Sequence, residues 1–326
     1  MNIAIAGTGF MGQTHAQCYL KLASTKLYAI AENNPAKQKI IRNTFPFVKI
    51  YEDVLEMIED KRIDLVDICL PTKLHTNATI AALNKGKHVL LEKPIALTLK
   101  EAEAMRKVSE NNNSKFMVAH VLRFWPAYVS IHQTLKKLMN VERITEIYAS
   151  RFNQLPLWSE NSWILNEENS GGLIIDLMIH DIDFISWCFG KIKRVYASAI
   201  CNKKKFAVQV LGILEMVNGT IAYLEGGYLN PEGYGLSSQV RIYGSNSLLE
   251  MYSHENIIKL NKNNKATKVI HVPNKDGYLE EIKYFVNCIK HNRTPEVITV
   301  GNAIESLKIC LALKNSLKQD HWISIK

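Results

Sequence analysis

The chain has 326 residues, of which 47% are hydrophobic and 22% charged, a balance typical of a soluble globular protein. This length predicts two domains with a large buried core, and no apolar run is long enough to span a membrane. The formal net charge of +9 could indicate nucleic-acid binding, but the lysines are spread along the chain instead of clustering on one element, so we expect no nucleic-acid partner.

Strand-like apolar runs alternate with helical patterns over the first 122 residues. Strands are expected near residues 2–6, 27–31, 65–70, 88–91 and 116–120, and helices near 10–24, 35–43, 52–60, 74–85 and 98–111. This alternation predicts a doubly wound parallel sheet, an α/β Rossmann domain over residues 1–122. Such sheets bind ligands beyond the carboxyl ends of their strands.

A glycine-rich motif, Gly7-Thr8-Gly9-Phe10-Met11-Gly12, follows the first strand and opens the first helix. Gly7 would allow the tight turn, Gly9 would let the backbone approach a pyrophosphate, and Gly12 would let the helix pack closely. The amides at the helix N-terminus would face the phosphates. The motif therefore predicts a dinucleotide site.

Glu32 ends the second apolar run, at about the spacing from the glycine motif where an acid binds ribose hydroxyls. Its charge would repel a 2′-phosphate, which predicts NAD as the cofactor in preference to NADP. Lys37 and Lys39 stand nearby and could instead help to bind that phosphate.

Polar turns follow two other strands. Leu65–Leu70 leads into Pro71-Thr72-Lys73-Leu74-His75, and His88–Leu91 leads into Glu92-Lys93-Pro94. Both turns are expected at the edge of the sheet where the nicotinamide would lie, so Lys93 would place an amine at the chemistry. Thr72 and His75 could line the nicotinamide, or Thr72 could simply be the N-cap of the next helix.

After residue 122 the pattern is that of an α+β domain over residues 123–326. Strands with the alternation of an antiparallel sheet are expected at 146–151, 194–201, 206–216, 219–227, 239–244, 257–260 and 267–272, and helices at 126–139, 171–189, 278–291 and 301–318. Lys203–Lys205 is expected at a hairpin tip. Because one face of such a sheet needs a cover, we expect a homodimer or homotetramer through the open face.

Asp176 and His180 are four residues apart in the helix expected at 171–189, so they would share one face, with Asp183 close to it. Their neighbours are apolar, and buried polar groups need partners. A carboxylate beside an imidazole suits general acid–base catalysis near neutral pH. The same pair could equally serve only to satisfy buried groups.

Together these motifs resemble the glucose–fructose oxidoreductase / inositol dehydrogenase / rhizopine-catabolism (Gfo/Idh/MocA) family, end to end and in the same order. The matching segments are the glycine motif, Glu32 (where Asp is more usual), Pro71–His75, Gly86–Pro94 and Gly171–His180. The spaced combination is far more specific than any single motif. The family joins a Rossmann domain to a domain with a large open antiparallel sheet.

The resemblance implies hydride transfer between NAD(P) and a C–OH or C=O group of a sugar, inositol or related polyol. Lys93 would hydrogen-bond the reacting oxygen, from a turn with a cis bond before Pro94, and His180 would take the hydroxyl proton. Asp176 would orient His180 or contact a neighbouring hydroxyl. A lysine can itself be the base, so Lys93 and His180 remain rivals for that role. No metal is expected.

Arg123 and Trp163 are further candidates for contact with the substrate. Arg123 lies in Arg123–Tyr128, which resembles the family's Arg-Phe-x-Pro-x-Tyr, and we favour a structural role for it over a substrate contact. Trp163, with Trp158, precedes the Asp176 helix and suits either a cyclic polyol or simple packing. The sequence has no arginine cluster suited to a sugar phosphate, so we expect an uncharged cyclic polyol or monosaccharide.

Two other functions share this pattern. An NAD-dependent glycoside hydrolase oxidises its sugar transiently and produces no net NADH, while a non-catalytic NAD-binding sensor commonly lacks the lysine or the histidine, both of which are present here. The six cysteines form no CxxC motif, which predicts free thiols. With no signal peptide before the first strand, we expect a cytoplasmic protein.

Overall fold

The computed structural model describes residues 1–157, 159–203, 206–255 and 257–325. The chain divides into two compact units, one made of Met1–Val121 and Asp276–Ile304, the other of Leu122–Lys275 and Glu305–Lys326. The sequence interpretation assigned everything after residue 122 to the second domain and did not predict the return of residues 276–304 to the first unit. Trp158 and two lysines of the Lys203–Lys205 run, for which we predicted roles, lie outside the described residues.

The first unit is built on a parallel sheet of six strands in the order β3-β2-β1-β4-β5-β6. The strands are β1 (Asn2–Ala6), β2 (Lys26–Ala31), β3 (Lys49–Tyr51), β4 (Leu65–Ile68), β5 (His88–Glu92) and β6 (Phe116–Ala119). Every residue of β4 and β6 is buried, which explains why β6 reads as a continuous apolar run and β4 as one interrupted only by Asp67. The order is that of a doubly wound sheet, so the predicted fold class is confirmed.

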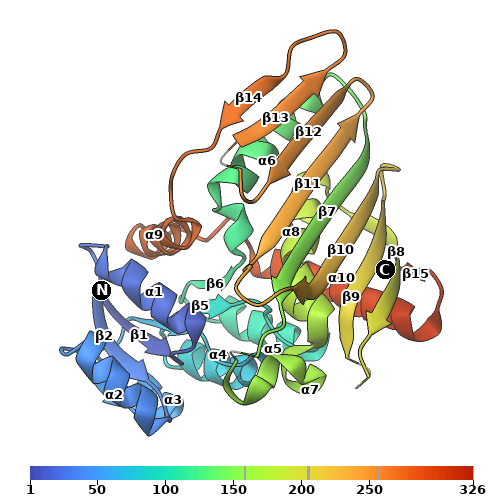
Figure 1. Ribbon diagram of the computed structural model, residues 1–326. Coiled ribbons are helices and arrows are strands. Elements are labelled where there is room, and N and C mark those ends of the chain that lie inside the picture. The colour runs from blue at the N-terminus through green and yellow to red at the C-terminus, as the bar shows by residue number, and fades with distance from the viewer. Residues whose placement is uncertain (158, 204–205, 256, 326) are drawn as a thin grey trace. The chain divides into compact units, whose positions relative to one another are not determined.

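Two groups of helices cover this sheet. They comprise α1 (Phe10–Leu20), α2 (Pro35–Thr44), α3 (Val54–Glu59), α4 (His75–Asn84), α5 (Leu99–Glu110) and α9 (Gly277–Lys290), with the 3₁₀ turn η1 (Thr72–Leu74) before α4. Helix α1 contacts α9, while α3 contacts α4 and α4 contacts α5. Helices α1 and α9 thus form one group, and α3, α4 and α5 form the other. Right-handed crossovers in a sheet of this order place these two groups on opposite faces (Figure 1).

The second unit is built on a nine-stranded sheet in the order β14-β13-β12-β11-β7-β10-β9-β8-β15. Its strands are β7 (Ile144–Gln154), β8 (Ile192–Cys201), β9 (Ala207–Met216), β10 (Ile221–Asn230), β11 (Ser237–Gly244), β12 (Ser247–Tyr252), β13 (Ile257–Lys262), β14 (Lys268–His271) and β15 (Ile323–Ser324). All neighbours are antiparallel except β7 and β10, which run parallel. A large, mostly antiparallel sheet is therefore confirmed.

Helices pack on one face of this second sheet (Figure 1). They include α6 (Pro126–Leu138), which contacts β13, α8 (Ile179–Phe189), which contacts β7, and the π-helix η4 (Ile174–Met178), which contacts β10. The remaining helical segments are η2 (Val121–Arg123), η3 (Glu160–Leu165), α7 (Glu167–Ser170) and α10 (Val300–Gln319). The strands alternate in burial, so the other face presents exposed side chains such as Leu211 and Tyr223. Among the described residues, no helix combines the length and apolarity needed to cross a membrane.

Candidate active site

The glycine loop after β1 has the backbone that the motif predicts. Gly7 has a φ of +89°, which disfavours any side chain, and a Cβ there would lie 2.9 Å from the carbonyl oxygen of Cys69. A Cβ on Gly12 would lie 2.0 Å from the carbonyl oxygen of Gly7, so α1 can start against the turn only with glycine at this position. A Cβ on Gly9 would meet no described atom within 4 Å, which leaves space for a pyrophosphate beside the loop.

Helix α1 begins at Phe10 with Gly9 as its N-cap, and no side chain among the described residues caps it. Phe10 is exposed and Met11 is half-buried. Amides at the N-terminus of a helix attract anions through their partial positive charge. The loop and the helix together therefore fit the phosphates of a dinucleotide.

Glu32 lies just beyond the end of β2 and is buried. Its Oε2 accepts hydrogen bonds from the Thr8 backbone nitrogen at 3.3 Å and from the Thr8 hydroxyl, and its Oε1 accepts one from the Asn34 nitrogen at 3.0 Å. The carboxylate thus anchors the glycine loop at the place where an acid could bind ribose hydroxyls. The sequence did not predict this anchoring role.

The turn after β4 brings His75 between two strand ends. The ring of His75 is buried, with Nδ1 at 2.8 Å from the carbonyl oxygen of Pro94 and Nε2 at 2.8 Å from that of Leu70. Burial lowers the pKa of His75, although the two carbonyl contacts oppose that effect. Thr72 opens the 3₁₀ turn after Pro71 and does not cap α4, so the N-cap alternative is wrong. Contact of Thr72 or His75 with nicotinamide stays a prediction.

The turn after β5 carries Lys93 and is held on both sides. The Lys93–Pro94 peptide bond is cis, as the resemblance implied. On one side of Lys93, Oε2 of Glu92 accepts a hydrogen bond from the Lys93 backbone nitrogen at 3.1 Å. On the other side, the Pro94 carbonyl meets His75. The backbone that bears the lysine is therefore tied to two neighbouring elements.

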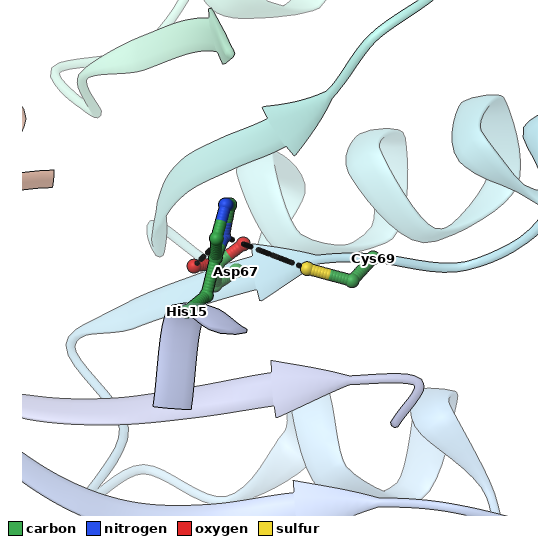
Figure 2. Close-up of side chains that lie close together, drawn as sticks. All are labelled: His15, Asp67 and Cys69. Carbon is green, nitrogen blue, oxygen red and sulfur yellow. Dashed lines mark hydrogen bonds and ion pairs between the residues drawn. The ribbon is translucent and has the colours of Figure 1, made fainter. Parts of the chain in front are cut away.

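A buried cluster that the sequence interpretation missed lies behind this turn. His15 of α1 has its Nδ1 2.9 Å from Oδ2 of Asp67 on β4, and Cys69 donates its thiol proton to Oδ1 of Asp67 at 3.4 Å (Figure 2). The other nitrogen of His15, Nε2, lies 3.2 Å from Oε1 of Glu92, at the distance of an ion pair. Burial alone would lower the pKa of His15, but Asp67 and Cys69 raise it well above its usual value.

The ligand atoms of His15, Asp67 and Cys69 lie within 4.8 Å of one another, so this set could also hold a metal ion. The 2.9 Å between His15 and Asp67 is the length of a direct hydrogen bond, which accounts for the cluster without an ion. That the reaction needs no metal stays a prediction. One signal in the sequence pointed to the cluster: Asp67 is an acid inside the otherwise apolar strand Leu65–Ile68, and a buried acid needs a partner.

In the second unit, the helix that bears Asp176 and His180 differs from the predicted one. Gly171 and Gly172 have φ of +83° and +78°, the helical segment begins at Gly172, and it contains a π-helix at Ile174–Met178 before it continues as α8. A π-helix bonds i to i+5, so the α-helical i, i+4 spacing no longer places Asp176 directly above His180. Such π segments occur frequently at functional sites.

Asp176 has a partner from the sheet. Its Oδ2 accepts a hydrogen bond from the Tyr228 hydroxyl on β10 at 2.8 Å. A Cβ on Gly226 would lie only 2.4 Å from Cγ of Met178, so glycine lets the π-helix pack directly on this strand. Tyr228 is a candidate site residue that the sequence interpretation did not find, because nothing in its local pattern distinguishes it from other strand tyrosines.

Arg123 and Asp183 form a buried bidentate pair. Nε and Nη2 of Arg123 each donate to a different oxygen of Asp183 at 2.9 Å, and the Ser306 hydroxyl donates to the same carboxylate at 3.0 Å. Asp183 therefore joins η2, α8 and α10 and does not extend the Asp176–His180 pair. Trp163 is half-buried in η3. Substrate contacts of Arg123 and Trp163 stay predictions.

Within each unit, the predicted residues fall into one group. In the first unit, the glycine loop, the Pro71–His75 turn and the Lys93 turn follow the adjacent strands β1, β4 and β5 at the same carboxyl edge, and Glu32 follows β2 beside them. In the second unit, Tyr228 on β10 contacts Asp176 of η4, and His180 follows in the first turn of α8. The first group suits a dinucleotide with an amine near it, and the second suits proton transfer.

Residues 1–120 match the family model described as an oxidoreductase family with an NAD-binding Rossmann fold, and residues 132–250 match the GFO/IDH/MocA C-terminal domain. The chain is 24% identical to scyllo-inositol 2-dehydrogenase (NAD⁺) of Bacillus subtilis, over 97% of this chain and 93% of that one. Its fold is similar to that of levoglucosan dehydrogenase in complex with NADH and levoglucosan, with a TM-score of 0.88 and 21% identity over 100% and 99% of the two chains. It is also similar to scyllo-inositol dehydrogenase from Lactobacillus casei with bound NAD(H) and scyllo-inositol, with a TM-score of 0.83 and 26% identity over 99% and 98%.

Proposed function

Because the chain belongs to the GFO/IDH/MocA oxidoreductase family, we propose that it is an NAD-dependent dehydrogenase of a sugar, inositol or related cyclic polyol. One observation carries the proposal: the Lys93 turn lies at the same sheet edge as the glycine loop and Glu32. That edge therefore offers both the features that hold a dinucleotide and an amine for a reacting oxygen. The relatives named for inositol and levoglucosan, with their NAD complexes, support the substrate class.

The reaction removes a hydride and a proton from one H–C–O–H group. Bound NAD supplies the hydride acceptor, and the protein has to bind the substrate and manage the proton. We assign the proton to the imidazole of His180 and assign to Lys93 the hydrogen bond that stabilises the oxygen as it gains negative charge. In the reverse direction, His180 returns the proton and the same lysine polarises the carbonyl.

Asp176 is the third residue of this assignment, and Tyr228 fixes its carboxylate. The Tyr228 hydroxyl donates to Asp176 at 2.8 Å, so the carboxylate is held from the sheet side. Burial and the neighbouring Asp176 raise the pKa of Tyr228 well above its usual value, so it remains a donor at neutral pH. We propose that Asp176, held in this way, orients His180 or binds a substrate hydroxyl.

The cofactor preference rests on Glu32. Its carboxylate is buried, is fixed by Thr8 and Asn34, and sits where the adenosine ribose would lie. A 2′-phosphate there would meet a fixed negative charge. We therefore expect NAD to bind more tightly than NADP.

The substrate is expected to be uncharged. The two buried arginines of the second unit, Arg123 and Arg151, are each paired with a carboxylate, Asp183 and Asp181 respectively. A guanidinium group that is already paired with a carboxylate is a poor partner for a sugar phosphate. Arg123 and Trp163 remain candidates for contacts to hydroxyl groups.

We also propose that copies of the chain associate through the open face of the nine-stranded sheet, where Leu211 and Tyr223 are exposed, to give a homodimer or homotetramer. All six cysteines are free, which supports a reducing cytoplasm. Sedimentation of the wild type beside Leu211→Glu tests the interface. A smaller particle for the variant is expected, and an unchanged mass would contradict this interface.

The test of the proposed function is NADH formation at 340 nm with NAD and a panel of inositols and monosaccharides, repeated with NADP and with phosphorylated sugars. Turnover of an uncharged cyclic polyol with NAD is expected. NAD binding by calorimetry without turnover of any polyol would contradict the proposal. Cleavage of a glycoside without net NADH would then identify the hydrolase, and binding with no reaction at all would identify the sensor.

A further inference from the structure

His15 stands between two acids inside the first unit and is completely shielded from solvent. One ring nitrogen meets Asp67 on β4 at 2.9 Å, and the other meets Glu92 at the end of β5 at 3.2 Å (Figure 2 draws the Asp67 side). Neither nitrogen can reach a substrate, because the whole ring is buried in the core: Nδ1 is hydrogen-bonded to Asp67, while Nε2 makes no hydrogen bond among the described residues and faces Glu92 at ion-pair distance. The residue therefore cannot be a proton donor or acceptor for the reaction itself.

The bridge leads directly to the backbone of Lys93. Glu92 uses Oε1 to face His15 and Oε2 to accept the Lys93 backbone N–H at 3.1 Å. Rotation of the Glu92 carboxylate would break this second contact, and it would also separate Oε1 from the imidazole, so the ion pair with His15 opposes that rotation. His15 thus limits the positions open to the residue that follows Glu92.

His15 also belongs to α1, the helix that begins at the glycine loop. Helix α1 runs from Phe10, next to the proposed pyrophosphate position, and presents His15 one turn further along. The bridge therefore links the dinucleotide-binding helix to the strand end that bears the amine. Hydride transfer requires just such a link, since the nicotinamide and the polarised oxygen must keep a fixed separation.

Burying this arrangement is costly, because two carboxylates and an imidazole are removed from water. A purely apolar core would fill the space between α1, β4 and β5 at lower cost. We propose that His15 is a positioning residue of the reaction: by bridging Asp67 and Glu92 it holds the turn that carries Lys93. This inference rests on the proposed function for its catalytic consequence, but the holding of the turn is a property of the fold.

The experiment compares His15→Gln with Cys69→Ala in the full chain. Cys69 is the matched control, because its thiol also contacts Asp67 at 3.4 Å and His15 at 3.6 Å but makes no hydrogen bond to Glu92 among the described residues. Three quantities are measured: hydrogen exchange of the peptide that spans residues 88–96, the dissociation constant of NAD, and kcat per NAD-binding site. The last quantity excludes unfolded molecules from the comparison.

For His15→Gln we expect exchange in the 88–96 peptide to become about ten-fold faster and kcat to fall roughly ten- to hundred-fold. The NAD dissociation constant and the substrate KM should stay within about three-fold of wild type, because the displaced group, the Lys93 amine, acts in the reaction and not in binding. Cys69→Ala should match the wild type in exchange and in kcat. Wild-type exchange or a wild-type kcat in His15→Gln would overturn the proposal.

A purely structural role for His15 would lower the melting temperature but leave kcat per NAD site unchanged. If His15→Gln does not fold, Glu92→Gln replaces it, since it removes the charge that faces His15 and should speed the same exchange. If the wild type turns over no polyol, the proposed function fails. The exchange comparison still decides, in that case, whether His15 holds the turn.

Discussion

The hydroxyl of Tyr228 donates a hydrogen bond to Oδ2 of Asp176 at 2.8 Å, joining strand β10 to the π-helix that precedes His180. The two residues are far apart in the sequence, and the contact exists because Gly226 lets Met178 pack against the strand. A hydrogen bond to a charged partner in a buried place contributes about 1.5–3 kcal/mol. The position of Asp176 therefore depends on a residue of the sheet.

Tyr228→Phe tests this dependence. Removing the hydroxyl removes this hydrogen bond to Asp176, so we expect kcat/KM for the polyol to fall about ten-fold or more, at nearly unchanged NAD affinity. Tyr148→Phe is the matched control, since its hydroxyl donates to Glu225 at 2.8 Å on the same sheet. The measurement is the steady-state kcat/KM of both variants. If Tyr228→Phe has the same kcat/KM as Tyr148→Phe, Tyr228 has no role in the reaction.

Lys93→Ala and His180→Ala test the two assigned roles. Each should lower kcat by roughly 10²–10⁴ while the NAD dissociation constant stays near the wild-type value. Lys85→Ala is the control for loss of a lysine, because Lys85 pairs with Glu59 at 2.7 Å on the surface. A His180→Ala enzyme with wild-type kcat would leave that histidine a purely structural role and make Lys93 the base.

Glu32→Gln separates the charge of Glu32 from its hydrogen bonds. The amide oxygen can still accept from Thr8, while the negative charge that repels a 2′-phosphate is gone. We expect weaker NAD binding and a smaller preference for NAD over NADP, measured as the ratio of kcat/KM values. An unchanged ratio would show that the ribose is recognised elsewhere.

The His15 bridge also predicts how stability changes with pH. The pKa of His15 in the folded state is raised, with burial opposed by Asp67 and Cys69, so its contribution is complete below its unfolded pKa of about 6.5 and is lost as the pH rises through the folded pKa. The titratable groups that face it are Asp67, Cys69, Glu92, Cys18 and Tyr278. Denaturant unfolding between about pH 6 and pH 9 should show the free-energy difference between wild type and His15→Gln shrinking. A difference that is constant or grows with pH would contradict a charged His15.

Much of the fold follows from regular patterns. The buried strands β1, β2, β4, β5 and β6 were predicted because parallel strands covered on both faces read as continuous apolar runs. Strand β12 was missed, and so were the short strands β3 and β15, since three residues at Lys49–Tyr51 and two at Ile323–Ser324 give no periodicity. The return of α9 to the first unit was missed too, because its apolar stripe is the same whichever unit it covers.

The candidate site was predictable where a backbone requirement selects a residue type. Gly7 and Gly12 are such cases, since a Cβ at either position would collide with backbone. The π-helix at Ile174–Met178 was not predicted, because its residues also suit an α-helix and the departure depends on packing against β10. Tyr228 and His15 were missed for the same reason: their roles come from partners that lie far away in the sequence.

The most direct test of the central claim is isotopic. The enzyme is incubated with NAD and the polyol identified by the panel, carrying deuterium on its carbinol carbons, and the reduced cofactor is analysed by mass spectrometry. Direct hydride transfer predicts that the NADH carries a single deuterium taken from the substrate. NADH without deuterium, or consumption of the substrate without any net NADH, would contradict the account.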